Sequence, residues 1–282
     1  MTTPARNPSN ESAAAPMIRR FGSMRESAIA ATDGELGSLE DVYFDDAGWT
    51  VRHLVVDTGT WLSGRRVLLS PRSILGTDPS GQRLITNLTR DQVTRSPDVG
   101  QDRPVSRQHE IELAGYYGYP FYWTGPYRWG ATASPMPVEG SVPLPAAPSA
   151  STPPRDAERG DPHLHSATEV IGYGIDAADG QLGHVEDYLI DEGTWAIRYL
   201  IVDPRNWWPN AHVVVGVDWL TGVSWERQTV GVDMTREAVR NAPEWRPETV
   251  IDRAWETQLH GYHGRPGYWE RPEDRWRWPH AA

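Results

Sequence analysis

Two pairs of adjacent carboxylates, Glu40-Asp41 and Glu186-Asp187, come closest in type and spacing to acid–base chemistry. Both fall in strand-like segments, where neighbouring side chains point to opposite faces unless a β-bulge redirects one of them. The favoured interpretation is therefore a bulge that carries solvated charge. A proton relay or a ligand contact is the alternative.

The histidines invite a search for a metal site. His163-x-His165 lies at the edge of a proline-rich stretch, and His260-x-x-His263 has helix-like spacing. Neither pair has a third convergent ligand, so structural or solvent-exposed histidines are expected and no metal or other cofactor is predicted. No G-x-S-x-G elbow or G-x-G-x-x-G loop is present, and no enzymatic activity is expected.

The composition excludes several chemistries outright. The 282 residues include no cysteine and no lysine, so thiolate, Schiff-base and phosphate-loop mechanisms are ruled out. All 27 basic residues are arginine, against 38 acidic ones, and the net charge of −11 argues against nucleic acid as a partner. Arg52 and Arg198 lie in mid-strand, where a salt bridge to a repeated acid is favoured over anion binding.

The elements that position these residues come from an internal duplication. Asp33–Gly37 recurs as Asp179–Gly183, an offset of 146 residues, and 29 of the 91 pairs from Asp33 to Trp123 are identical without a gap. Each copy predicts a strand, a hairpin turn and a second strand, Leu36–Phe44 and Trp49–Asp57 in the first. The apolar phase slips at Glu40-Asp41, which predicts the bulge.

Further strands are predicted at 67–69 and 84–86, and at 213–215 and 229–232. Thr89 and Thr235 are expected to begin short helices that Pro97 and Pro243 terminate. The expected organisation is a disordered leader (1–23), a first barrel (24–97), an aromatic tail (98–130), a Pro/Ala/Ser-rich linker (131–167), a second barrel (168–243) and a second tail (244–282).

The D-G-x-L-G hairpin, the V-x-x-L-V-V-D strand and the closing T-R-x-x-V-x-x-x-P resemble the PRC-barrel family, over Met24–Pro97 and Val170–Pro243. The resemblance implies a mainly β fold: two small PRC-type β-barrels, each of about five or six strands plus a short helix, joined by a Pro-rich linker. The family is named for the cytoplasmic barrel of the photosynthetic reaction centre H subunit, and its members bind partners without being known as enzymes.

The resemblance predicts a non-enzymatic interaction or regulatory module that binds a protein partner. The alternatives are an H-subunit-like accessory protein in electron transfer or proton delivery, and a small-ligand-binding protein. No apolar run approaches the ~20 residues that span a bilayer, and a cytoplasmic location is expected. Peripheral association with a membrane complex, pairing of the two barrels and homo-oligomers stay open.

Aromatic side chains in the tails and one loop are the candidate contacts for a partner. The favoured interpretation of the tails is nonetheless that each wraps its own barrel, with a tight turn at Gly115, Gly118 and Pro120. The candidate residues are Tyr116, Tyr122, Trp123, Trp207, Trp208, Tyr262, Tyr268 and Trp269.

Overall fold

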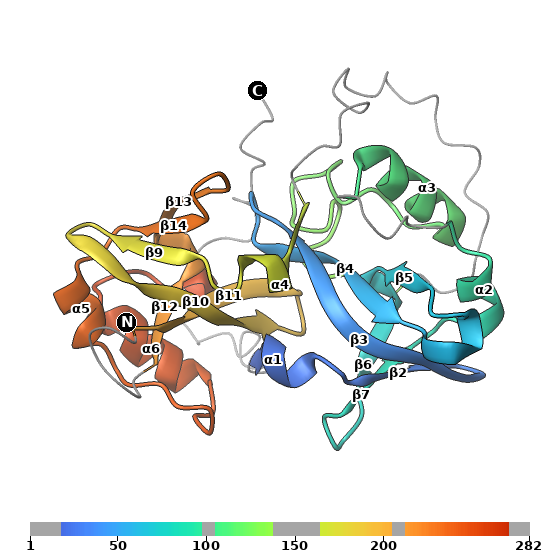
Figure 1. The fold of residues 1–282 in the computed structure, drawn as a ribbon, viewed down its shortest axis with the longest axis horizontal. Coiled ribbons are helices and arrows are strands. Elements are labelled where there is room, and N and C mark those ends of the chain that lie inside the picture. The colour runs from blue at the N-terminus through green and yellow to red at the C-terminus, as the bar shows by residue number, and fades with distance from the viewer. Residues whose placement is uncertain (1–17, 98–104, 138–163, 205–211, 271–282) are drawn as a thin grey trace, which may run out of the picture.

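The structure, a computed structural model, describes residues 18–97, 105–137, 164–204 and 212–270. These residues form a mainly β molecule in which the first half (18–137) and the second half (164–270) lie side by side (Figure 1). The strands of the first half are β1 (Ile18–Arg20), β2 (Ala28–Ala31), β3 (Gly34–Asp45), β4 (Thr50–Asp57), β5 (Arg66–Leu69), β6 (Ile74–Thr77) and β7 (Arg83–Thr86).

The second half repeats this order of strands. Its strands are β8 (Leu164–Ser166), β9 (Gly174–Ala177), β10 (Gly180–Asp191), β11 (Ala196–Asp203), β12 (Val213–Gly216), β13 (Leu220–Ser224) and β14 (Thr229–Val232). Every strand from β2 to β7 therefore has a counterpart about 146 residues later, as the duplication predicts.

Short helices connect and flank the strands. The α-helices are α1 (Phe21–Met24), α2 (Arg90–Thr94), α3 (Arg107–Tyr117), α4 (Ala167–Val170), α5 (Arg236–Arg240) and α6 (Arg253–Tyr262), and the 3₁₀ turns are η1 (Gly59–Leu62), η2 (Pro71–Ser73), η3 (Val217–Trp219) and η4 (Tyr268–Glu270). Thr89 and Thr235 cap α2 and α5 as expected, and the amide side chain of Gln92 completes a capping box at α2.

The fourteen strands form one sheet. Ten of them lie in the order β13-β14-β9-β10-β11-β4-β3-β2-β7-β6, and the other four, β1, β5, β8 and β12, pair with strands along this path. Within each half the first strand of the repeat pairs in parallel with the last, β2 with β7 and β9 with β14. The halves meet where β11 lies beside β4, with Ala196 opposite Thr50.

The two short strands that precede the repeats are exchanged between the halves. β1 pairs with β10 of the second half, and β8 pairs with β3 of the first. The helix that follows each strand goes with it, so α1 lies near β10 and α4 near β3 at the centre of the molecule (Figure 1). Each half thus supplies one strand to the sheet of the other.

Trp49 and Trp195 mark the junction between the halves. Both residues end a hairpin turn with positive φ, 47° and 56°, which is unusual for a large side chain. The amide of Val51 donates to the carbonyl of Trp195 at 2.8 Å, and the amide of Ile197 donates to that of Trp49 at 2.7 Å. This reciprocal pair of hydrogen bonds joins the two hairpins.

Three expectations about boundaries need correction. The expected leader ran to residue 23, but residues 18–23 belong to β1 and α1 because their partners lie on β10. The expected linker ran to residue 167, but Leu164–Ser166 form β8 on β3. The tail is also not a turn from Gly115 onward, because α3 continues to Tyr117 and ends where Gly118 takes φ 71°.

No helix in the described part of the chain is long and apolar enough to cross a membrane.

Candidate functional site

The bulge predicted at the acidic pairs is present in both halves. The register of β3 on β4 shifts between Leu39 and Asp41, and that of β10 on β11 shifts between Val185 and Asp187. The extra residue lets the strand bend. The expectation of solvated charge is wrong for the second acid of each pair, because Asp41 and Asp187 are both buried.

Each buried aspartate caps the exchanged helix of the other half. Asp187 accepts from the amide of Gly22 at 3.0 Å and from Nε of Arg20 at 2.5 Å. Asp41 accepts from the amide of Thr168 at 3.1 Å and from its hydroxyl at 2.7 Å. The acids therefore hold the two halves together at the N-terminal ends of α1 and α4.

Asp187→Ala is expected to lower the free energy of unfolding by about 1–3 kcal/mol, because the Gly22 amide and the Arg20 guanidinium lose their shared acceptor. Glu186→Ala, one residue away and 26% exposed, loses only its ion pairs with His212 and Arg20 and keeps the cap, so it serves as the comparison at about 1 kcal/mol or less. Urea unfolding gives the energies, and hydrogen exchange should rise in α1 and β1. Equal losses in both variants, with exchange unchanged there, would rule the cap out.

Arg52 forms the salt bridge expected of it. Its Nε lies 2.7 Å from Oδ2 of Asp45, and both side chains are fully buried. The other oxygen of Asp45 accepts from the amide of Gly48 at 2.5 Å and so fixes the hairpin turn. Arg198 and Asp191 repeat the ion pair at 2.6 Å in the second half.

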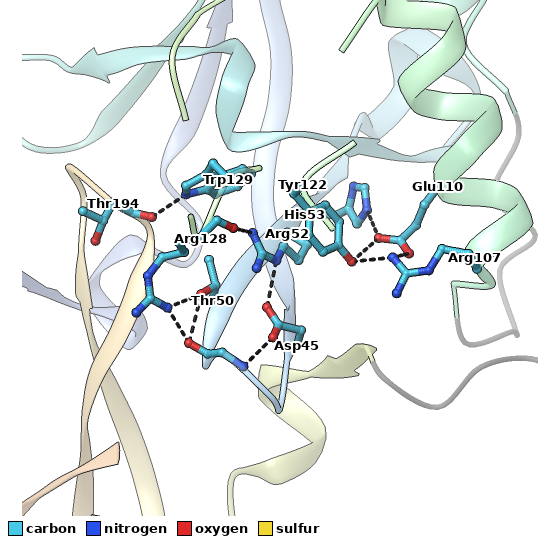
Figure 2. Close-up of polar contacts among 11 residues, drawn as sticks. Asp45, Thr50, Arg52, His53, Arg107, Glu110, Tyr122, Arg128, Trp129 and Thr194 are labelled. Atoms are coloured by element: carbon cyan, nitrogen blue, oxygen red, sulfur yellow. Dashed lines mark hydrogen bonds and ion pairs between the residues drawn. The ribbon is translucent and has the colours of Figure 1, made fainter. Parts of the chain in front are cut away.

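The first network continues from Arg52 into the tail (Figure 2). The guanidinium of Arg52 lies 3.9 Å from the ring centroid of Tyr122, whose hydroxyl donates to Glu110 at 2.8 Å. Glu110 pairs with Arg107 at 2.9 Å, and Arg107 in turn lies 4.1 Å from the ring of Trp123. Helix α3 is thereby fastened to strand β4 by alternating charge and aromatic contacts.

The second network repeats the ion pair and the two cation–ring contacts at the offset of 146 residues, whereas Glu256 accepts its hydrogen bond from the hydroxyl of Tyr199. Arg198 lies 3.8 Å from the ring of Tyr268, Arg253 pairs with Glu256 at 3.0 Å, and Arg253 lies 4.0 Å from the ring of Trp269. The two networks consist of Asp45, Arg52, Arg107, Glu110, Tyr122 and Trp123, and of Asp191, Arg198, Arg253, Glu256, Tyr268 and Trp269.

The buried glutamates and their arginines were not predicted as site residues. Arg107-x-x-Glu110 and Arg253-x-x-Glu256 are identical at the repeat offset, which is the signal that could have found them. In α3 and α6 this spacing places the two side chains on one helix face, so each pair can turn inward together.

A buried histidine touches each network from a different element. His53 of β4 places Nε2 3.3 Å from Glu110. In the second half Tyr199 occupies the equivalent strand position, and its hydroxyl lies 2.9 Å from Glu256 and 3.1 Å from Nε2 of His260 on α6. Among the described residues no group of three or more His, Asp or Glu side chains is placed to hold a metal, and His163 lies outside them.

The networks hold the tails to the strands. Burial raises the pKa of the Glu256 carboxyl, while the Tyr199 hydroxyl and the Arg253 charge lower it. Burial also raises the pKa of Tyr122 well above its usual value, so this phenol stays protonated and donates to Glu110. Each carboxylate is engaged by a hydroxyl and a guanidinium, an arrangement that orders a structure.

The end of the first tail lies at the junction of the halves. Arg128 donates to the carbonyl of Gly48 at 2.5 Å, and Nε1 of Trp129 donates to the carbonyl of Thr194 at 2.8 Å (Figure 2). Burial and the nearby charges of Arg198 and Arg52 lower the pKa of Arg128 to about 9. One tail thus contacts both hairpin turns.

A cavity of about 40 Å³ remains beneath this tail, lined in part by Arg52, His53 and Trp129. The equivalent positions of the two halves differ in side-chain size. The first half has Ser73 and Ala114, whereas the second half has Trp219 and His260, whose rings pack 5.0 Å apart. The cavity has room for a few atoms only, far less than the several hundred Å³ of most ligand pockets.

The structure separates the candidate aromatic residues into two groups. Tyr122 is buried in the first network, and Trp123, Tyr268 and Trp269 are half-buried there or in its counterpart, so none of the four is a free contact surface. The exposed candidates are Tyr116 at 40% and Tyr262 at 45%. Trp207 and Trp208 lie outside the described residues.

The fold is a mainly β structure with an internal repeat, in which an aspartate on a bulged strand of each half caps a short helix of the other half. Residues 25–93 match the family model described as the PRC-barrel domain. The match covers the first copy from the start of the repeat to α2. No curated protein matches the chain.

Proposed function

We propose that the chain is a non-enzymatic tandem PRC-barrel module that binds a protein partner. The partner contacts the ends of the tail helices. The tails themselves are structural parts of the module, because the two networks fasten them to the barrels.

Three observations support a second PRC-barrel in residues 168–243. The repeat is ungapped over 91 positions, the strand order and the parallel closing pair are the same, and the register shift falls at the same acidic residue. The caps also agree, since Asp33 and Asp179 each accept from the first amide of the helix that closes the repeat, at 2.8 Å.

The observation that carries the proposed contact is the exposure of Tyr116 and Tyr262. They occupy the same position near the end of α3 and α6, and both stay accessible while the tail aromatics that follow them pack inward. Tyrosine is enriched among the residues that dominate binding energy. The net charge of −11 favours a partner with a basic surface.

The double variant Tyr116→Ser, Tyr262→Ser is expected to weaken partner binding at least about tenfold, because both contact residues are truncated. Affinity purification with mass spectrometry identifies the partner, and titration of the purified pair gives the affinity. Val250→Ser removes another exposed apolar side chain, 78% accessible, and should leave binding unchanged.

Equal binding by the wild type and the tyrosine double variant would contradict the proposed contact. Recovery of the chain in membrane fractions with a pigment–quinone complex would instead favour the H-subunit-like accessory role.

A further inference from the structure

The cavity beneath the first tail is lined by a buried arginine, Arg72, whose charge the networks do not balance. Arg72 lies in the turn η2 and is 4% exposed. In the described part of the chain its side chain makes its polar contacts with Trp129, which is neutral. Nη2 donates to the carbonyl of Trp129 at 2.6 Å, and the guanidinium lies 5.4 Å from the centre of that ring. A guanidinium stays charged in a protein, and burying a charge is costly unless an opposite charge meets it.

The neighbouring charges do not neutralise this arginine. Arg52 lines the same cavity and lies 4.9 Å from the same indole ring (Figure 2). Burial and, after it, the charge of Arg52 lower the pKa of Arg72 to about 10, so Arg72 is still protonated at pH 7. The carboxylate of Asp45 pairs with Arg52, and that of Glu110 pairs with Arg107. The charge of Arg72 is therefore in surplus.

The phenol of Tyr119, which also lines the cavity, supplies no counter-charge. Burial raises its pKa to about 12, so this side chain is neutral at pH 7. Arg72 is thus a buried cation that faces neutral groups and a second cation across a small cavity.

The surplus charge belongs to the first half alone. At the repeat offset of 146 residues, Asp218 stands in place of Arg72, and His260 stands in place of Ala114 at the cavity wall. The ring of His260 packs 5.0 Å from that of Trp219. The second half therefore has an acid and packed rings where the first half has an arginine and a cavity.

We propose that this cavity binds a small monovalent anion, of the size and chemistry of chloride, beside Arg72. A cavity of roughly 10–15 Å³ holds one water molecule, so a volume of about 40 Å³ admits a halide ion, which is little larger than water. A guanidinium has five N–H donors, and the Trp129 carbonyl takes one of them. The anion accepts from the others and supplies the counter-charge. This site is independent of the tyrosines assigned to the protein partner.

The ion also stabilises the end of the first tail. Consecutive carbonyls of the tail hold the two arginines of the cavity, Arg128 accepting from Arg52 at 2.8 Å and Trp129 from Arg72. The indole of Trp129 in turn donates to Thr194 of the second half. Hydrogen exchange at the backbone amides of this tail should therefore slow when chloride is present.

Thermal unfolding of the full chain in mixtures of sodium chloride and sodium gluconate at constant ionic strength tests the site. Gluconate, with six carbons, is too large for the cavity. The midpoint is expected to rise by about 2 °C or more as chloride increases from about 1 to 100 mM, because a ligand that binds the folded state stabilises it. Line broadening of the ³⁵Cl magnetic resonance measures binding directly.

Two variants separate the charge from the space. Arg72→Gln removes the charge, and Ala114→Leu fills the cavity while the charge stays. Each is expected to weaken chloride binding at least about tenfold. Arg246→Gln, the control, removes an arginine whose side chain is 69% exposed and should keep the full response. Near-ultraviolet circular dichroism verifies that each variant is folded.

Absence of ³⁵Cl broadening by the wild type would overturn the proposal. A chloride response that either Arg72→Gln or Ala114→Leu retains in full would do so as well, because the ion would then lie away from this cavity or act as a general salt.

Discussion

Asp45→Asn is expected to lower the free energy of unfolding by about 3–5 kcal/mol. The asparagine oxygen can still accept from the amide of Gly48, so the hairpin turn keeps its cap. The Arg52 guanidinium, however, loses its negative partner while both side chains lie out of contact with water. A buried charge left without its counter-ion is among the most costly single changes.

Urea unfolding measures this loss, with the exposed pair Glu244–Arg246 as the control. Glu244→Gln breaks an ion pair of similar type at the surface and should cost less than about 1 kcal/mol. Asp191→Asn tests the same pair in the second half and should resemble Asp45→Asn. If Asp45→Asn were no more destabilising than Glu244→Gln, Arg52 would not depend on Asp45 for its burial.

The local structure followed from the sequence because its determinants are local. The phase slip at Glu40 and Glu186 predicted the bulges, since a strand exposes alternate residues to one face. Thr89 and Thr235 predicted the helix starts for a similar reason, because a capping hydroxyl reaches only three residues along the chain.

The exchange of β1 and β8 could not be predicted in this way. Ile18 lies opposite Asp191 and Tyr43 opposite Ser166, more than a hundred residues away in each case. Periodicity shows that a segment is extended, but it does not show which strand pairs with it. The prediction of a disordered leader is wrong for residues 18–23, because this short segment becomes ordered on a partner strand far away in the sequence.

The candidate site was predicted in part. Arg52 and Arg198 were expected to pair with repeated acids, because a mid-strand arginine needs a counter-charge. Glu110 and Glu256 were missed, since a charged residue in a polar helix usually faces solvent. The signal in the sequence that could have identified these two glutamates is that they are identical across the repeat. Tyr122 was predicted to contact a partner, but it is buried because its hydroxyl donates to Glu110.

Gly37→Ala is expected to cost about 3 kcal/mol or more, and it explains the second glycine of the D-G-x-L-G hairpin. Strand β3 passes so close to the end of β4 that a Cβ on Gly37 would lie 1.9 Å from the carbonyl oxygen of Asp57 and 2.9 Å from Cα of Thr58. Both contacts are with backbone, which cannot rotate away, and Gly37 also has φ 140°.

The matched control is Gly115→Ala in α3, where a Cβ meets no atom within 4 Å and the backbone is helical. That change should stabilise the protein by about 0.5–1 kcal/mol, because alanine favours helix.

Gly183→Ala separates the effect of the close backbone contact from the effect of the positive φ in Gly37→Ala. Its Cβ would lie 2.2 Å from the carbonyl of Asp203, but Gly183 has no positive φ. Thermal midpoints within a few degrees of wild type for both Gly37→Ala and Gly183→Ala would show that the strands can separate, and close approach would then not be the reason for these glycines.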